Sequence, residues 1–468
     1  MPNDLIHPRT LKGFRDYLPE AMIPREGIVD TAKRVYRSFG FAPIDTPALE
    51  YLEILTGKGS DETDKQLYRF EDHGGRRVGL RFDLTVPLAR FAAQHAGQLG
   101  LPFKRYQIAS VWRGENTQRG RYREFMQCDF DTVGTTAVVA DIEAVVVVHD
   151  LLRAIGFGAT GADGPPGAQP DGGGFTIRLN NRAVLTGLLE KAGLAGQATG
   201  VLRALDKLAK IGPDKVADEL RSSAGATTRQ ADEVLRLVQL GGDNASLLDQ
   251  VDSLVAGSGV GEAGAARLRE VFAGAAAAGV DPARVRLDVS IARGLDYYTG
   301  LVLETFLDEL PEIGSVASGG RYDNLAGLYT KQLLPGIGAS LGLDRLLAAM
   351  ETLKLLPASK TPAPVFIPYF AADRLGDYLK LAAAFRAAGF GVELYPEPKK
   401  LGKQLQYADK KGFRLALIAG PDEFQAGVCQ VKDLATGESK QVPIAESPSA
   451  VKEALAACGN RRTPAAGP

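Results

Sequence analysis

Residues 103–133 read FKRYQIASVWRGENTQRGRYREFMQCDFDTV. The segments 103–112 and 123–133 have the composition of β-strands, and the loop between them is rich in Arg, Gly, Asn and Gln. Their short separation predicts an antiparallel pair. Alternation along the second strand divides its side chains between two faces: Phe125, Gln127, Asp129 and Asp131 on one, and Met126, Cys128 and Phe130 on the other. A polar face on a central strand is costly unless it lines a cavity or meets partners, and the alternative is a sheet with one face in water.

The loop that joins these two strands carries the residue types that bind phosphate. Arg113, Glu115 and Arg121 combine two cations with one carboxylate, and guanidinium groups bind phosphate oxygens in pairs of hydrogen bonds. The segment 80–84 is predicted to be a short strand, with Arg81, Asp83 and Thr85 pointing one way. This repeats the polar pattern elsewhere in the chain. Together the two stretches suit a polyphosphate nucleotide held beside a small polar ligand.

Two further stretches carry chemistry. Residues 293–300 read RGLDYYTG and place one arginine and two tyrosines before a strand, which suits a ligand with a carboxylate and a heteroaromatic ring; mere packing of the tyrosines is the alternative. The glycines of 336–342, GIGASLG, would let a flat ring approach the backbone ahead of Arg345. The alternative is a glycine-containing core helix. We expect a helix from about residue 338 with an apolar stripe of Leu343, Leu346, Leu347 and Met350.

The chain of 468 residues predicts several domains. A helix is expected over 25–39, with an apolar side formed by Ile28, Val29, Ala32, Val35 and Tyr36. A second, buried helix is expected over 136–155. The Gly- and Pro-rich stretch 156–174 is predicted to be a surface loop. Residues 183–280 are predicted to form a helical insertion, with Thr227 and Gln230 as a capping box. After a linker at 359–364, alternating strands and helices, among them a helix over 401–411, predict a small α/β domain with a largely parallel sheet. This domain is expected to end in a hairpin-like pair around Thr436 and Gly437.

Composition narrows the class of protein. Hydrophobic residues make up 45% and charged residues 24% of the chain, as in soluble globular proteins. No run is long and apolar enough to cross a membrane, and the N-terminus lacks the pattern of a secretory signal. Three scattered cysteines suit a reducing cytoplasm rather than a disulfide framework or a zinc site. The formal charge of −1 requires that any nucleic acid bind a local basic patch, for which the candidates are Lys399, Lys400, Lys403, Lys410 and Lys411; a solvated helix face is the alternative.

Several enzyme classes are not indicated. The sequence has no Gly-x-Ser-x-Gly elbow, no His-Glu-x-x-His motif and no Walker A loop. Its four histidines lie in unrelated contexts, so a hydrolase is not predicted, and no metal ligands are assigned.

The motifs taken together resemble those of class II aminoacyl-tRNA synthetases, and of histidyl-tRNA synthetases in particular. Residues 40–47 resemble class II motif 1, a dimer-interface element; residues 103–131 resemble motif 2, and 338–350 resemble motif 3. Residues 293–298 and 319–323 resemble the two histidine-specific motifs. The resemblance covers roughly residues 8–358, and the last domain fits the anticodon-binding module of the family.

This resemblance implies an α+β fold. An antiparallel sheet flanked by helices would carry a helical insertion and be followed by a C-terminal α/β anticodon-binding domain. The implied division is a first catalytic part (1–182), the insertion (183–280), a second catalytic part (281–358) and the anticodon-binding domain (363–458).

The family roles carry over to residues of this chain in two groups. For ATP, Arg113 would hold the α-phosphate, Glu115 the adenine, and Arg121 and Arg345 the β- and γ-phosphates, with Phe125 under the adenine. For L-histidine, Asp83, Thr85 and Gln127 would bind the α-amino group, Asp131 and Tyr298 the imidazole nitrogens, and Tyr297 and Tyr322 would line the pocket. Arg113 would also hold the carboxylate, and Arg293 would approach the α-phosphate from the other side. Aspartate rather than glutamate at positions 83 and 131 resembles the eukaryotic-type branch.

The implied activity is the ATP-dependent ligation of L-histidine to tRNA(His) by a cytoplasmic homodimer, with Mg²⁺ accompanying the nucleotide. Two alternatives remain. A catalytically inactive paralogue, such as the regulatory subunit of histidine biosynthesis, typically lacks the ATP arginines and the last domain, and both are present here. An enzyme that activates histidine without tRNA would not need the lysine-bearing segment 401–411.

Overall fold

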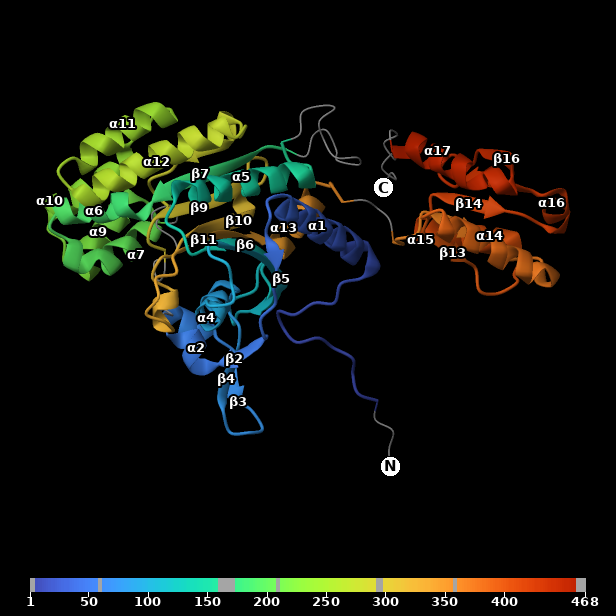
Figure 1. The fold of residues 1–468 in the computed structure, drawn as a ribbon, viewed down its shortest axis with the longest axis horizontal. Coiled ribbons are helices and arrows are strands. Elements are labelled where there is room, and N and C mark those ends of the chain that lie inside the picture. Colours follow the sequence, from blue (N-terminus) through green and yellow to red (C-terminus); the bar gives the residue numbers. More distant parts are fainter. Residues whose placement is uncertain are drawn as a thin grey trace. The chain divides into compact units, whose positions relative to one another are not determined.

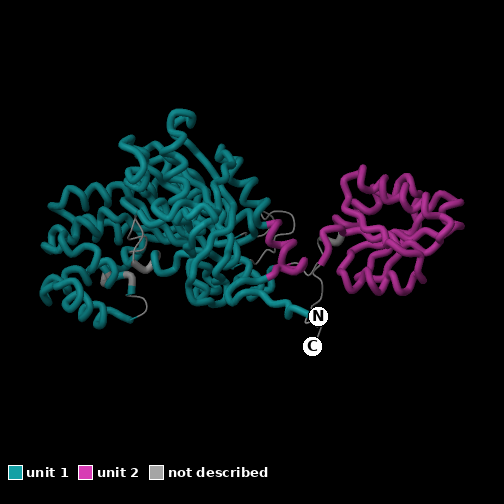
Figure 2. The backbone as a smooth tube through the Cα atoms, turned by 90° about the horizontal axis from the view of Figure 1, so that it is seen from below, with its two compact units in different colours: residues 1–15, 28–355 teal, residues 16–27, 356–468 magenta. Residues whose placement is uncertain are grey.

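The computed structural model describes residues 5–57, 61–158, 173–207, 211–291, 298–356 and 360–459. The chain divides into two compact units, residues 1–15 with 28–355 and residues 16–27 with 356–468 (Figure 2). The expected surface loop at 156–174 lies largely outside the described residues, as do parts of the linker and the tail.

The larger unit is built on a mixed sheet that has eight strands among the described residues, in the order β1-β5-β6-β11-β10-β9-β7-β8 (Figure 1). Its neighbours pair antiparallel except for β1 with β5 and β7 with β8. The strands are β1 (Ala42–Pro43), β5 (Phe103–Trp112), β6 (Glu124–Val133), β7 (Phe175–Asn181), β8 (Val285–Leu287), β9 (Leu301–Leu307), β10 (Ala317–Arg321) and β11 (Gly336–Gly342). The predicted antiparallel pairing of the motif 2 strands is confirmed.

A small antiparallel sheet, β2-β4-β3, lies beside this one. Its strands are β2 (Leu49–Tyr51), β3 (Arg69–Glu71) and β4 (Arg77–Leu80). The helices of this part are α1 (Pro19–Ser38), α2 (Leu52–Thr56), α3 (Asp61–Gln66), α4 (Thr85–His95), α5 (Val138–Ile155) and α13 (Leu343–Thr352).

The apolar face of β5 and β6 is covered by helix α1. The Tyr36 hydroxyl donates to the Cys128 carbonyl at 2.8 Å, and its ring lies 5.3 Å from that of Phe130 and 5.7 Å from that of Tyr106. Ile28, Ala32 and Val35 of the predicted apolar stripe are also buried, whereas Val29 is half-buried. Because strand side chains alternate, this packing leaves the face with Asp129 and Asp131 for other partners.

Residues 182–277 are mostly helical: α6 (Arg182–Lys191), α7 (Ala198–Asp206), α9 (Pro213–Ser223), α10 (Thr228–Leu235), α11 (Asn244–Val255) and α12 (Gly259–Ala277). The predicted capping box is present, since the Thr227 hydroxyl accepts from the Gln230 amide and the Gln230 side chain accepts from the Thr227 amide. Helix α12 packs against α5 and α6, which attaches these helices to the sheet.

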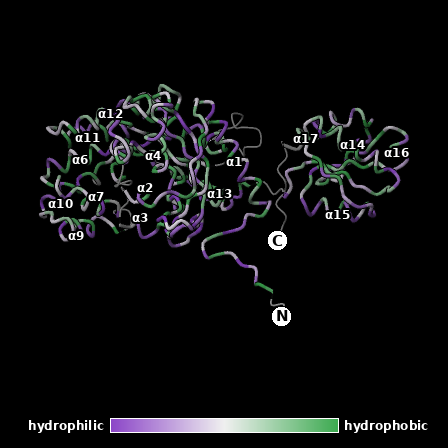
Figure 3. The backbone as a smooth tube through the Cα atoms, turned by 60° about the horizontal axis from the view of Figure 1, so that its bottom comes forward, coloured by the Kyte–Doolittle hydropathy of each residue, from purple (hydrophilic) through white to green (hydrophobic). Residues whose placement is uncertain are grey.

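The C-terminal unit contains a five-stranded sheet in the order β13-β12-β14-β15-β16. Its strands are β12 (Val365–Ile367), β13 (Val392–Leu394), β14 (Leu415–Ile418), β15 (Val428–Asp433) and β16 (Ser439–Pro443), and its helices are α14 (Leu375–Ala387), α15 (Leu401–Lys411), α16 (Pro421–Ala426) and α17 (Ser447–Gly459). Strands β13, β12 and β14 are parallel, whereas β15 and β16 add an antiparallel edge. Hydrophobic residues are concentrated in the strands at its centre (Figure 3).

Candidate active site

A block of buried polar side chains lies on one face of the central strands β5, β6 and β11. The register places Arg105, Asp131 and Gly338 in one row across the three strands, and Gln107, Asp129 and Ser340 in the next. Ala109, Gln127 and Gly342 form a third row. Arg105 is fully buried, and Gln107, Asp129 and Asp131 are no more than 3% exposed. Burial of this many polar groups is costly unless they hold one another or a ligand.

The segment that carries Asp83 and Thr85 is not the predicted strand. Strand β4 ends at Leu80, and helix α4 begins at Thr85. Asp83 Oδ1 accepts the backbone N–H groups of Thr85 at 3.1 Å and Val86 at 2.9 Å, so this carboxylate holds the first turn of the helix. Burial raises the pKa of Asp83, against the lowering effect of Arg113 and Arg105.

Residues 336–342 form a central strand, so the expected helix from residue 338 is wrong at its start. Helix α13 begins only at Leu343, and it carries the predicted apolar stripe. The reason lies in partners far along the chain: this stretch pairs with both β6 and β10. A Cβ on Gly338 would lie 2.1 Å from Asp131 Oδ1, and one on Gly336 would lie 2.2 Å from the Tyr322 ring. The glycines therefore make room for a carboxylate and a phenol.

Asp131 is held from two sides. The Tyr322 hydroxyl donates to Oδ1, and Arg105 Nη2 lies 2.6 Å from Oδ2. The Nη2–H bonds of Arg105 are not aligned with Oδ2. This oxygen therefore has no hydrogen-bond partner among the described residues. Burial raises the pKa of Asp131, and the Arg105 charge opposes the rise. The Tyr298 ring packs against the hydrophobic cluster that contains Tyr322. It also lies close to Gly320, where an added Cβ would be 2.9 Å from the ring.

Two more groups in the block have unused hydrogen-bonding capacity. Gln127 Nε2 donates to Ser340 Oγ at 3.0 Å, while its Oε1 has no hydrogen-bond partner within the described part of the chain. The same holds for Asp129 Oδ1. Burial raises the pKa of Asp129 to about 7, with Arg105 opposing and Asp131 adding to the rise.

Arg113 connects this block to the loop expected to hold ATP. Its Nε donates to the Phe82 carbonyl at 3.1 Å, and its guanidinium lies 4.3 Å from the Phe82 ring centroid and 5.1 Å from that of Phe125. In the same loop, Arg121 Nη1 lies 3.6 Å from Glu115 Oε2. The two aromatic rings restrict how the plane of the guanidinium group can turn. A guanidinium held in this way is suited to bind a planar anion.

The start of α13 lies against the same loop. Gly120 has a φ of +70°, and a Cβ there would lie 3.2 Å from the Cα of Arg345. Arg345 Nη1 donates to the Ser315 carbonyl, and Asp344 Oδ2 accepts the Met126 N–H at 2.8 Å. Motif 2 and motif 3 are therefore in contact, although more than 200 residues separate Met126 from Asp344.

The structure thus brings together most of the predicted site residues. One group contains Asp83, Thr85, Gln127, Asp131, Tyr298 and Tyr322, and the other contains Glu115, Arg121, Phe125 and Arg345, with Arg113 between them. Arg293 and Tyr297 lie outside the described residues.

Comparison with known proteins identifies the family. The family model described as histidyl-tRNA synthetase matches residues 13–346, and the model described as anticodon binding domain matches residues 364–454. The chain belongs to the histidyl-tRNA synthetase family. The first match covers all the site residues above, and this membership confirms the resemblance found in the sequence.

Two curated members of the histidyl-tRNA synthetase family and one crystal structure show how complete the similarity is. The histidine–tRNA ligase of Rhodopirellula baltica is 64% identical over 454 residues, which are 97% of this chain and 99% of that protein. That of Wolinella succinogenes is 44% identical, over 93% and 96% of the two chains. The crystal structure of histidyl-tRNA synthetase from Nostoc sp. PCC 7120 matches with a TM-score of 0.85 and 35% identity, over 96% of this chain and all of that one. The predicted fold class is thereby confirmed.

A structure from Bacillus halodurans, titled as an ATP phosphoribosyltransferase regulatory subunit/histidyl-tRNA synthetase, also has this fold. Its TM-score is 0.70 at 22% identity, over 87% of this chain and 97% of that one. At this identity the similarity establishes only the fold.

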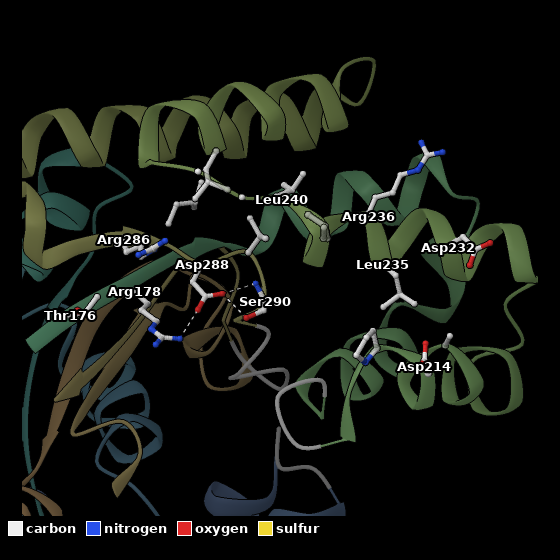
Figure 4. A pocket seen from close by; sticks show the side chains of 18 residues that line it. Thr176, Arg178, Asp214, Asp232, Leu235, Arg236, Leu240, Arg286, Asp288 and Ser290 are labelled. Carbon is white, nitrogen blue, oxygen red and sulfur yellow. Dashed lines mark hydrogen bonds and ion pairs between the residues drawn. The ribbon is translucent and has the colours of Figure 1, made fainter. Parts of the chain in front are cut away.

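A cleft of about 980 Å³ lies elsewhere in this histidyl-tRNA synthetase fold, between strands β7 and β8 and the helices α9 and α10 (Figure 4). Its charged lining residues are balanced in sign: Arg178, Arg236 and Arg286 against Asp214, Asp232 and Asp288. Arg178 Nη1 donates to Asp288 Oδ2 at 3.0 Å, so part of that charge is already neutralised. None of the predicted site residues lines this cleft.

Sequence reasoning missed Arg105 and gave no role to Asp129. The signal was available in the strand alternation, because Arg105 and Gln107 recur two residues apart in β5, as Asp129 and Asp131 do in β6. Only the register shows that Arg105 faces Asp131.

Two further findings concern metal sites and membrane spans. Across the described ranges, no group of three or more His, Cys, Asp or Glu side chains is placed to hold a metal ion. No helix in the part of the chain that the structure describes is both long and apolar enough to span a membrane.

Proposed function

We propose that this chain joins L-histidine to tRNA(His) in two steps, through a histidyl-adenylate, with release of AMP and pyrophosphate. The observation that carries the proposal is the near-complete match to curated histidine–tRNA ligases, which spans the catalytic part and the anticodon-binding module of one chain. The four-part division at 1–182, 183–280, 281–358 and 363–458 is proposed on the same basis.

The histidine site is proposed at the polar face of β5 and β6. Asp83, Thr85 and Gln127 bind the α-amino group, and the unpartnered Gln127 Oε1 supports this, because an ammonium is a donor only. Asp131 and Tyr298 bind the two imidazole nitrogens, with Tyr297 and Tyr322 beside the ring. A site whose buried groups pair with both nitrogens rejects analogues that leave those groups unpaired.

The ATP site is proposed around the motif 2 loop. Arg113 contacts the α-phosphate and the histidine carboxylate, Arg121 and Arg345 the outer phosphates, and Glu115 and Phe125 the adenine. The contact of Gly120 with Arg345 supports this grouping, since it brings two arginine-bearing segments to one place. Arg293 completes the set from the opposite side of the α-phosphate.

The first step then needs charge stabilisation rather than proton transfer. A histidine carboxylate oxygen attacks the α-phosphorus, the bond to the β-phosphate oxygen breaks, and pyrophosphate leaves. Negative charge grows on the equatorial oxygens, where the proposal places the cations of Arg113 and Arg293; cations already in place stabilise such charge without reorganisation. In the second step a ribose hydroxyl at the tRNA end attacks the adenylate carbonyl, and AMP leaves.

Mg²⁺ is the proposed companion of ATP, and when bound it neutralises charge on the phosphates. Such ions are usually held by substrate phosphates with only one or two carboxylates. That mode fits a site whose described residues contain no three-carboxylate cluster.

Two partners, tRNA and a second copy of the chain, are proposed from surface residues. The lysines of α15 and its flank are proposed to contact tRNA phosphates, and phosphate contacts require such local cations in a chain of net charge −1. A homodimer is proposed through residues 40–47, which resemble motif 1; the apolar side chains of Leu49 and Tyr51, next along the chain, are 42% and 51% exposed. A cytoplasmic location is proposed from the curated bacterial relatives and the scattered cysteines.

One assay separates this function from the two alternatives: histidine-dependent exchange of pyrophosphate with ATP, measured with and without transfer of histidine to tRNA. Exchange followed by transfer is the expected result. Exchange without transfer would leave the tRNA-independent activating enzyme, and absence of exchange would leave a regulatory paralogue.

A further inference from the structure

Arg105 is a fully buried guanidinium that the family-derived assignment does not use. It lies on β5, directly across from Asp131 of β6 in the sheet register. Its Nη2 approaches Asp131 Oδ2 at 2.6 Å and lies 3.4 Å from the Leu84 carbonyl. Its Nε and Nη1 have no hydrogen-bond partner within the described ranges. A buried arginine is normally held by several acceptors, so packing alone does not account for this one.

The surroundings of Arg105 are strongly acidic. Asp83, Asp129 and Asp131 are all no more than 8% exposed, and the Arg105 charge lowers the pKa of each of them against the effect of burial. Removal of one partner from such a buried group leaves an uncompensated charge, which is more costly than the pair itself. Arg105 is therefore the cation that makes an anionic Asp131 tolerable at this depth.

Asp131 keeps unused hydrogen-bonding capacity while it is held. Oδ1 accepts from the Tyr322 hydroxyl, and Oδ2 is approached by Arg105 without hydrogen-bond angles. A carboxylate has about four acceptor positions, so positions remain on both oxygens for an imidazole N–H. Only the ionised form accepts at every one of these positions.

We infer that Arg105 is a positioning residue for histidine recognition: it fixes the orientation and the anionic state of Asp131, so that Asp131 accepts the imidazole N–H of the substrate. The inference rests on the proposed function and deepens it. Arg105 touches Asp131 rather than the reacting atoms, so its removal affects histidine more than ATP.

The first test compares Arg105→Met and Arg105→Lys in histidine-dependent pyrophosphate–ATP exchange, with the full-length protein. Arg105→Met is expected to raise the histidine KM about 10- to 100-fold, because the substrate imidazole loses its hydrogen bond to an ionised Asp131. The ATP KM should stay within about threefold, because a remote positioning residue does not alter nucleotide binding. Arg105→Lys should recover part of the histidine affinity, since it keeps the charge but not the planar fork.

The second test is the pH profile of kcat/KM for histidine, which a purely structural role would not move. Without Arg105 the pKa of Asp131 rises further, so the acid limb should shift to higher pH by about one unit in Arg105→Met and much less in Arg105→Lys. The other titratable groups near Asp131 remain in all variants: Asp129 on β6, Asp83 before α4 and Tyr322 after β10, with Tyr36 of α1 on the opposite face of the sheet. The imidazole titration of the substrate is also common to all variants.

Arg90→Met is the matched control, because it removes another largely buried guanidinium, one that pairs with Glu50. It should lower the melting temperature without a change in the histidine KM or the acid limb. A folded Arg105→Met or Arg105→Lys protein with wild-type histidine KM and an unmoved acid limb would overturn the inference. A wild-type protein without any exchange would instead overturn the proposed function.

Discussion

Both the eight-stranded and the five-stranded sheet bury polar side chains, but among the described residues only the first contains buried side chains with unused hydrogen-bonding atoms. In the C-terminal unit, Gln404 is fully buried and uses both ends of its amide: Oε1 accepts from the Tyr369 N–H, and Nε2 donates to the carbonyls of Tyr369 and Lys399. In the catalytic unit, the Oε1 atoms of Gln107 and Gln127 have no partner among the described residues. A buried glutamine can therefore be structural, and it is the unused hydrogen-bonding capacity that indicates a ligand site.

The strands themselves show the same difference. The central strands β12 and β14 of the C-terminal sheet bury apolar side chains on both faces, with Val365, Phe366, Leu415 and Ala416 inaccessible. This is the usual composition of parallel strands covered by helices. A sheet of this kind has no internal polar face to offer a ligand, so a tRNA must bind the surface of the unit. The central strands of the larger sheet instead expose one polar face to an internal site.

The largest expected effect is on the catalytic side. Arg113→Ala should lower the rate of pyrophosphate–ATP exchange by about 10³-fold, because it removes a fixed cation from the place where charge develops. Arg76→Ala is the control: its side chain is 61% exposed and pairs with Asp72 on the surface, and such pairs contribute little. Comparable rates for the Arg113 variant and the control would contradict the assigned role.

Removal of residues 363–468 should separate the two units functionally. Exchange should remain within about threefold of wild type, while charging of tRNA should fall by about 10²-fold or more, because one of two linked contacts to the same ligand is lost. Circular dichroism would verify that the remaining part is folded. Full charging by a folded truncated protein would show that the polar-faced unit binds tRNA alone.

The glycines of the two units offer a sharper contrast. Gly338→Ala would place a Cβ 2.1 Å from Asp131 Oδ1 and 2.3 Å from the Phe130 carbonyl oxygen, so both the carboxylate and the neighbouring β6 backbone must move. A displacement of about 1 Å can cost about 10²-fold. We expect the histidine KM to rise and the ATP KM to change little. Gly376→Ala in α14 meets no atom within 4 Å and should leave exchange unchanged. Equal kinetics for the two variants would mean that Asp131 has room that the structure does not show.

The smallest expected effect is on stability. The pKa of Asp129 is raised to about 7 by burial, so between pH 4 and pH 7 the folded protein holds a proton that the unfolded chain has lost. Stability therefore falls as the pH rises through this window and is level above it. Asp129→Asn does not titrate, so its stability relative to wild type should rise between pH 5 and pH 8 by on the order of 2 kcal/mol. Thermal melting at both pH values measures this, and parallel melting curves would refute it.

Much of the fold followed from local pattern. The motif 2 strands, the helix with Ile28 and Tyr36, the capping box at Thr227 and helix 401–411 have the expected type at the expected place. Each depends on side-chain periodicity or on a turn of backbone, which neighbouring residues determine. The largely parallel C-terminal sheet is confirmed for β13, β12 and β14, and the hairpin-like pair predicted around Thr436 and Gly437 is the antiparallel pair β15 and β16.

One error lies where distant partners decide the structure, and another where a side chain holds the start of a helix. Residues 336–342 have glycines that indicate neither a helix nor a strand, and they become a strand because β6 and β10 supply ladder partners on both sides. Residues 80–84 alternate like a strand, yet Asp83 caps helix α4 instead. The eukaryotic-type assignment, drawn from Asp83 and Asp131, stays a prediction.

The amino-acid sequence by itself determined the family, the motifs and the residue types of the candidate site, because spacing and residue type can be read without knowing which residues are in contact. Only the tertiary structure decided which charges meet. Arg105 becomes a partner of Asp131 through the register of two strands, and the depth at which they meet sets the cost of every unpaired charge there. Burial and pairing are properties of the assembled sheet, and no local stretch of sequence carries them.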